Sequence, residues 1–278
     1  MIIFNNNSIG YVLDTDASKV IEAVRSTGVT ITPAMRHYAH YLISNMKNIG
    51  TWQNSLAVYG FVGGTASSHK WNWKDLRDVD AAFRLTYTGG VTHSSNGIQF
   101  NGSTGYANTF FNPSIQLSSS STHLYTYIKA VANAATVSPY LSGISDSGNI
   151  FGLLNRTQGG FVKGYQSSNS SSTDFYYNTL LGSTPLLKSF SGNLLGGVIS
   201  SWNNAIKISL DLTGSFGSAL PNANIPIGCQ INTSSIPQYD LYGNYLLSCV
   251  SVGSGLTDAQ IIQRDQIINN AQLILNRA

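Results

Sequence analysis

The chain has 278 residues, of which 42% are hydrophobic, so it can bury a sizeable core and wholesale disorder is excluded. Charged residues make up 10%, against roughly 25% in ordinary soluble domains, and Ser, Thr, Asn and Gly take their place. The net charge is +3 without a run of Lys or Arg, which argues against nucleic-acid binding. No stretch approaches the roughly 18 continuous apolar residues of a membrane span, so membrane insertion is not expected.

Residues 1–54 are predicted to form an extended segment followed by two helices, a unit for packing or for attachment to a neighbouring protein. The first helix is expected to start at Asp16 as N-cap. The second has Thr32 as N-cap and Pro33 at the first helical position, which is the preferred place for proline in a helix.

Residues 55–278 are predicted to form a β-sandwich with a final helix. Apolar residues recur at every second position, as in Phe83, Leu85 and Tyr87, and this period is typical of half-buried strands. Strand signals at intervals of about ten residues indicate a sandwich. The predicted strands are 57–62, 82–88, 97–101, 122–130, 149–155, 160–165, 195–202, 205–212, 225–228 and 244–252.

Three connections stand out between these strands. Asn101-Gly102 and Asn203-Asn204 each follow an apolar run, and both are expected to be hairpin turns. The low-complexity stretch Ser167–Thr173 is expected to be an exposed loop tip.

A C-terminal helix is predicted over residues 257–276. Thr257 and Gln260 form a capping box at its start. Ile261, Ile268 and Leu275 are spaced seven residues apart, which leaves two interpretations. The helix packs on the edge of the sandwich, or these three residues form a contact between protomers of a trimer.

Carboxylates that could cleave a glycan are scarce. Glycoside hydrolysis uses two carboxyl groups about 5 to 10 Å apart, yet Glu22 is the only glutamate and lies in the first predicted helix. Asp78 and Asp80 lie two residues apart, but Lys74 and Arg77 beside them favour a turn held by ion pairs. We therefore expect no catalytic residue and no enzyme, with an aspartate-based polysaccharide depolymerase as the alternative.

Metal and cofactor signals are equally weak. His37 and His40 lie near one face of the second predicted helix without a third ligand in range, so no metal and no cofactor is predicted. Cys229 and Cys249 could form a disulfide if their Cα atoms came within about 7 Å, or remain two buried thiols, which we favour.

Aromatic side chains are the remaining candidates for ligand binding, because sugar rings stack on exposed aromatic faces. Trp71 and Trp73 lie two apart and would point the same way on a strand. Tyr176 and Tyr177 follow the serine-rich stretch, and Tyr242 belongs to a tyrosine cluster near Asp240. We expect these five aromatic residues to contribute to a sugar-binding surface.

Several phrases of the sequence resemble one family. They are Gly63-Gly64-Thr65-Ala66, His69-Lys70, the segment DLRDVDAA from Asp75 to Ala82, and the run from Asn101-Gly102 to Asn112-Pro113. From about Ile31 to the C-terminal helix, the chain resembles phage virion proteins that carry a laminin-G/concanavalin-A-like jelly roll. The resemblance implies a jelly-roll sandwich and a structural, fibre-type virion protein of head or tail that faces the host. It transfers no residue-level function.

Three functions follow as hypotheses. The favoured one is a non-enzymatic virion protein that contacts host surface glycans through its jelly roll; the others are a virion subunit that only bridges its neighbours, and a depolymerase. Other virion proteins are the expected partners, and a homo-oligomer, with a trimer favoured, is expected from the resemblance to fibres. The N-terminus shows no secretory signal, so we expect assembly in the host cytoplasm and a final location in the virion.

Overall fold

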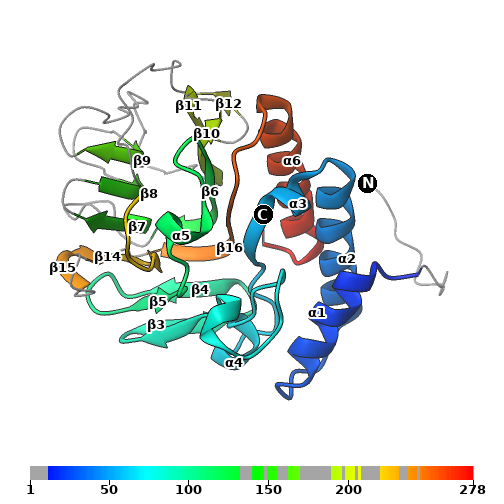
Figure 1. Cartoon of the computed structure of the whole chain (residues 1–278). Helices are drawn as coiled ribbons and strands as arrows, with labels where there is room; N and C mark the ends of the chain where they lie inside the picture. The colour runs from blue at the N-terminus through cyan, green and yellow to red at the C-terminus, as the bar shows by residue number, and fades with distance from the viewer. Residues whose placement is uncertain are drawn as a thin grey trace.

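The structure is a computed structural model that describes residues 12–131, 140–146, 149–155, 162–169, 189–195, 198–203, 206–207, 220–231, 237–242 and 245–277. Two mostly antiparallel sheets face each other, and helices cover the outer side of one of them (Figure 1). The prediction of a mostly β sandwich with a few helices is confirmed.

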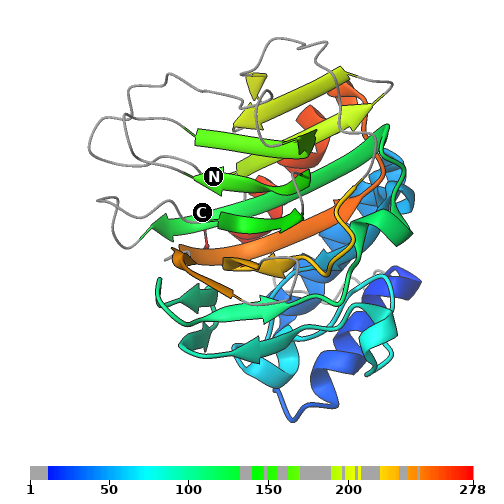
Figure 2. The same ribbon diagram turned by 60° about the vertical axis from the view of Figure 1, so that its left-hand side comes forward.

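The first sheet is organised around two long neighbouring strands, β6 and β16, which run antiparallel side by side (Figure 2). β1 and β4 both pair with the edge of β16 that faces away from β6, and β10 pairs with the edge of β6 that faces away from β16. Among the described residues the strand order is β12-β11-β10-β6-β16-β4-β3. Its strands are β1 (Ser55–Tyr59), β3 (Val91–Ser94), β4 (Gly97–Phe100), β6 (Ser121–Val131), β10 (Ser189–Leu195), β11 (Val198–Asn203), β12 (Ile206–Lys207) and β16 (Tyr245–Gly253).

In the second sheet the order within the described part is β15-β14-β7-β13-β5-β2, with β8 on β7 and β9 on β8. β14 runs parallel to β7, and the other pairs given for this sheet are antiparallel. Its strands are β2 (Thr86–Thr88), β5 (Tyr106–Asn108), β7 (Tyr140–Asp146), β8 (Asn149–Asn155), β9 (Val162–Asn169), β13 (Pro226–Ile227), β14 (Cys229–Ile231) and β15 (Pro237–Tyr242).

Strand β6 is buried on both faces. Leu124 and Ile128 point into the core between the sheets, whereas Tyr125 and Tyr127 point into a second core beneath the helices. Because successive side chains of a strand alternate between faces, these apolar and aromatic residues of β6 contribute to both cores. The molecule therefore has three layers: sheet, sheet and helices.

The helical layer consists of α1 (Thr15–Arg25), α2 (Pro33–Asn48) and α6 (Asp258–Ile274), with short helices at Thr51–Asn54 (α3), Ala66–His69 (α4), Asp80–Ala82 (η1) and Pro113–Gln116 (α5). Thr32 caps α2 and Pro33 occupies its first turn, as predicted. For α1 the predicted N-cap is wrong: Asp14, rather than Asp16, accepts the backbone N–H bonds of the first turn. The predicted boundary after residue 54 falls between α3 and β1.

The predicted hairpin at Asn101-Gly102 is a turn between the two sheets, because β4 belongs to the first sheet and β5 to the second. Asn101 Oδ1 accepts three successive backbone N–H groups in this turn. The turn packs on Gly89, which connects β2 to β3 with φ +69, and a Cβ on Gly89 would lie 2.0 Å from the Thr104 carbonyl oxygen. Asn203 lies opposite Ile206 in the antiparallel pair β11–β12, which confirms the other hairpin.

Two strand predictions and one loop prediction are also corrected. Of the predicted strand 82–88 only Thr86–Thr88 (β2) is a strand, because the 3-10 helix Asp80–Ala82 ends at Phe83 in the left-handed conformation. Residues 195–202 span the end of β10 and most of β11, two antiparallel strands rather than one. Residues 167–169 continue β9 instead of forming a loop tip, and 170–173 lie outside the described residues.

The seven-residue repeat of the C-terminal helix faces the chain's own sheet. Ile261 and Ile268 are 1% exposed, and Leu275 is partly buried against the helical core. The prediction of a contact between protomers through these three residues is therefore wrong, because their side chains pack within one chain. The helix lies over the face of the first sheet together with α2 (Figure 1).

Candidate functional site

Trp71 and Trp73 do not form the predicted exposed platform. Trp71 is 7% exposed and Trp73 is 3% exposed, and both belong to the core beneath the helices. Trp73 meets Tyr38 edge to face and lies against Gly60, where a Cβ would come within 2.2 Å of the indole. Both rings are therefore unavailable for stacking on a sugar.

The other predicted aromatic residues cannot be placed as a surface. Tyr176 and Tyr177 lie outside the described residues. The backbone of Tyr242 ends β15 opposite Cys229 of β14, and its side chain is outside the described part.

The segment that begins Gly63-Gly64 contains the short helix α4. Thr65 and Ser68 form a capping box at the start of this helix, and His69 at its end is buried in the interior. His69 Nε2 accepts the backbone N–H of Gly64, so the proton of the neutral ring is on Nδ1 and is donated to Nδ1 of His93 at 3.1 Å. Burial, with His93 beside it, lowers the pKa of His69 to about 3. The buried His69 therefore has a structural role, in which it connects Gly64 to His93.

The DLRDVD segment is held by ion pairs, but the predicted partners are wrong: Arg77 pairs with Asp75, and Lys74 bonds to the Trp52 carbonyl. Asp78 contacts Lys70 and Arg84, and Arg84 also binds Asp80 at 2.9 Å. Hydrogen bonds from Lys70 hold the pKa of Asp78 below its usual value. A general acid for glycan cleavage needs a raised pKa, so this arrangement does not suit Asp78 for that role.

A serine and a histidine lie within hydrogen-bond reach beneath α6. His123 Nδ1 donates to the Ser254 carbonyl at 2.6 Å, which leaves Nε2 as acceptor for the Ser251 hydroxyl at 3.3 Å. This is the order of contacts in a nucleophile–base pair. However, His123 is 0% exposed and Ser251 is 1% exposed, and burial lowers the pKa of His123 to about 3. In this arrangement the pair links the neighbouring strands β6 and β16 in the interior of the protein.

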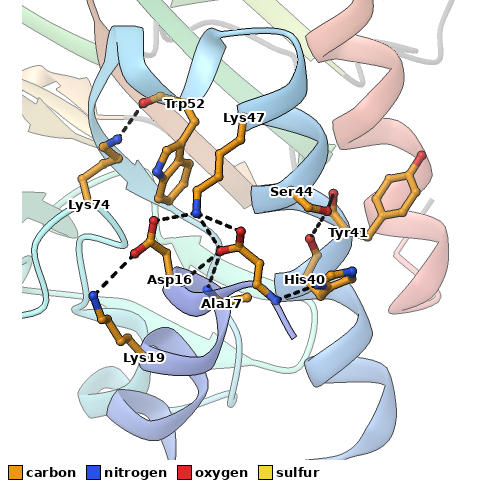
Figure 3. A network of polar contacts seen from close by, with 10 residues as sticks. Asp16, Ala17, Lys19, His40, Tyr41, Ser44, Lys47, Trp52 and Lys74 are labelled. Atoms are coloured by element: carbon orange, nitrogen blue, oxygen red, sulfur yellow. Dashed lines mark hydrogen bonds and ion pairs between the residues drawn. The ribbon is translucent and has the colours of Figure 1, made fainter. Parts of the chain in front are cut away.

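A polar network fastens α1 to α2 (Figure 3). Lys47 on α2 places its Nζ 2.8 Å from both oxygens of Asp14 and 2.8 Å from Asp16. The hydrogen bond from Lys47 lowers the pKa of Asp16. Burial acts to raise the pKa of Asp14, but the hydrogen bonds from Lys47 and from the backbone N–H groups of Ala17 and Asp16 together lower it. Both carboxylates therefore remain ionised around one ammonium group.

The same network fixes the ring of His40. The backbone N–H of Asp14 donates to His40 Nδ1 at 3.0 Å, so the proton of the neutral ring lies on Nε2. Lys74 lies on the opposite side of the network from His40. It donates to the Trp52 carbonyl at 2.7 Å, and its ammonium group lies 4.3 Å from the centre of the Trp52 ring (Figure 3).

Next to this network, the outer face of α2 carries a hollow of about 280 Å³. Tyr41 reaches from it toward α6 (Figure 3). Asn270 of α6 donates to the tyrosine hydroxyl at 3.3 Å. We call this feature the α2 hollow; it is lined by His37, His40, Tyr41, Ser44 and Asn45.

Sequence reasoning singled out His37 and His40 as neighbours on one face, which the hollow confirms, but it missed the other three lining residues. Their spacing of four, seven and eight residues from His37 is the signal that could have found them. Within the described part of the chain, no group of three His, Cys, Asp or Glu residues could hold a metal. Cys229 and Cys249 are both free and buried, which confirms the thiol alternative.

No family model matches the sequence, and no curated protein matches it. Among solved structures, the chain is similar to domain 4 of AbnA, a GH43 extracellular arabinanase from Geobacillus stearothermophilus, in complex with arabinotriose. The identity is 15% and the TM-score 0.50, over 77% of this chain and 98% of that one. It is also similar to a Trypanosoma rangeli sialidase mutant displaying trans-sialidase activity, with 13% identity and a TM-score of 0.54 over 92% of this chain.

The match to that sialidase covers 39% of its chain, so the present chain spans about two fifths of the enzyme's length. The prediction that the protein is not an enzyme is overturned by these neighbours, which come from an arabinanase and a sialidase. At such identities the likeness shows the fold alone and assigns no reaction to this chain. Among the described residues, no helix has the length and apolar character to cross a membrane.

Proposed function

We propose that this protein is a virion component of a phage that contacts glycans through its jelly-roll, concanavalin-A-like sandwich. The observation that carries the glycan part is the match to nearly the whole of an arabinanase domain in complex with arabinotriose. The arabinanase and the sialidase whose structures resemble this chain are both named for their action on glycans.

The surface chemistry supports the same proposal. Charged residues make up only 10% of the chain, so its polar surface is built largely from neutral hydroxyl and amide groups. Such groups exchange hydrogen bonds with sugar hydroxyls without the cost of desolvating a charge.

The virion part of the proposal is supported by the resemblance of the Gly63–Lys70, Asp75–Ala82 and Asn101–Pro113 segments to phage structural proteins. A virion presents many copies of a protein, and linked copies raise the effective affinity of weak sites by about 10² to 10⁴. Millimolar contacts with single sugar units are therefore sufficient for attachment, and we propose that the chain acts as a homo-oligomer, with a trimer favoured.

Two measurements test the two parts separately. Peptides of this chain should appear in purified phage particles analysed by mass spectrometry, and their absence would remove the virion part. The purified protein should bind host cells, and soluble host polysaccharide should abolish that binding. Binding to cells that polysaccharide does not inhibit would contradict the glycan part.

A further inference from the structure

The α2 hollow has side chains that are fixed before any ligand arrives. Ser44 Oγ donates to the His40 carbonyl at 2.6 Å, and Asn45 Nδ2 donates to the Tyr41 carbonyl at 2.7 Å. These bonds to the preceding helical turn hold both side chains in one orientation. A ligand that binds them loses little side-chain entropy on binding.

The groups left for a ligand match a sugar. With its Nδ2 engaged, Asn45 offers the acceptor Oδ1, and Ser44 Oγ keeps its lone pairs. The Tyr41 hydroxyl accepts from Asn270 and can still donate its own proton. Sugar hydroxyls both donate and accept, so one sugar unit can use all three side chains.

The hollow also offers an aromatic corner. The rings of His37 and Tyr41 lie 6.2 Å apart at 88°, so one presents its edge to the face of the other. A sugar stacked on either ring brings its hydroxyls toward the second ring and toward the polar groups of the helix. The volume of about 280 Å³ is at the lower end of small-molecule sites, near 300 Å³, and suits one sugar unit.

Charge selects between classes of sugar. None of the five lining residues is an Asp, Glu, Lys or Arg. The ammonium group of Lys47 beside the hollow is surrounded by two carboxylates, so it does not present a net positive charge to an incoming anion. An acidic sugar would have no built cationic partner there, whereas a neutral sugar needs none.

We propose that the α2 hollow binds one neutral sugar unit of a host glycan, with Tyr41 as the stacking residue and Asn45 and Ser44 as acceptors. This inference rests on the proposed glycan contact and assigns it to the helical layer. The site lies outside both β-sheets.

The test is an NMR titration of the full-length, ¹⁵N-labelled protein with L-arabinose, D-galactose and N-acetylneuraminic acid as separate probes. The two neutral sugars should shift the backbone amides of residues 37–45, and the acidic sugar should not. Tyr41→Ala should weaken binding about tenfold, in line with the loss of an aromatic contact of up to roughly 1.5 kcal/mol. Arg36→Ala, on the same helix but outside the lining, should leave the affinity unchanged.

Tyr41→Phe is the control for misfolding, because it keeps the ring and removes only the hydroxyl. It should bind the neutral sugars more weakly than the wild type and more tightly than Tyr41→Ala. Shifts confined to the sandwich, with Tyr41→Ala at full affinity, would overturn this site and leave the proposed function standing. Stronger binding of N-acetylneuraminic acid, lost in Arg36→Ala, would overturn the preference for neutral sugars. If the intact protein binds no glycan at all, both this site and the glycan part of the proposed function fail.

Discussion

Arg277, next to the last residue, holds the end of the chain against the sandwich. Its side chain is 2% exposed and donates to the carbonyl of Ser95 at 2.7 Å, to that of Phe61 at 2.7 Å and to that of Gly60 at 3.4 Å. The guanidinium group also lies 5.8 Å from the centre of the Tyr38 ring. These contacts join the segment after α6 to the turn between β3 and β4 and to the segment after β1.

The change Arg277→Met keeps most of the side-chain volume and removes all of these donors. A hydrogen bond to a charged group contributes about 1.5 to 3 kcal/mol, and two of the three are short. Burial lowers the pKa of Arg277, so desolvation of the cation offsets part of this gain. We expect a net loss of about 3 kcal/mol in the free energy of unfolding, since buried carbonyls lose their partners.

Equilibrium unfolding in urea measures this loss directly. The midpoint should fall while the slope stays constant, because the same surface is exposed on unfolding. Arg25→Met, which removes an exposed partner of Glu22, is the control and should leave the midpoint in place. A free energy of unfolding for Arg277→Met within about 0.5 kcal/mol of the wild-type value would refute the structural role given to Arg277.

Three further predictions concern other parts of the fold. Gly89→Ala should destabilise the protein by roughly 2 kcal/mol, because a Cβ there meets the Thr104 carbonyl oxygen and the backbone has φ +69; an unchanged melting temperature would contradict the packing of this turn. Lys47→Met removes the cation that lowers the pKa of its two aspartate partners. In the wild type that stabilisation is present above the ordinary aspartate pKa of 3.8 and is lost as the pH falls through the lower folded pKa. The variant should therefore lose less unfolding free energy between about pH 5 and pH 3, and identical pH profiles would argue against the network. Burial raises the pKa of Cys229 and of Cys249 to about 12, so a thiol reagent should react with neither at neutral pH in the native protein and with both in denaturant; fast native labelling would count against their burial.

Much of the architecture could be predicted from local sequence signals. Thr32 and Pro33 start α2 because the hydroxyl accepts a free backbone N–H and proline needs none. Thr257 and Gln260 form the predicted capping box of α6 for the same reason. The period of two indicated the strands of a sandwich, although of Phe83, Leu85 and Tyr87 only Tyr87 lies in a strand, because Phe83 ends a 3-10 helix in the left-handed conformation.

Signals that depend on neighbours in space were interpreted less well. The spacing of Ile261, Ile268 and Leu275 defines an apolar stripe, but it does not reveal whether the chain's own sheet or another protomer covers that stripe. Trp71 and Trp73 were expected on an exposed surface, since the sequence does not show that the first sheet is covered on its outer face.

Only two of the five residues that line the α2 hollow were identified from the sequence, for a similar reason. His37 and His40 attracted attention as possible metal ligands, whereas Tyr41 and Asn45 resemble the polar outer face of any helix. What distinguishes Tyr41 is its contact with Asn270 of α6, more than 200 positions later in the chain, and local sequence carries no signal for such a contact.

The most direct test of the central claim is a glycan array probed with the intact, multivalently displayed protein. Saturable binding to neutral oligosaccharides is the result that the proposed function predicts. Uniform absence of binding to every glycan, from a sample whose circular dichroism shows the folded β-rich protein, would contradict it.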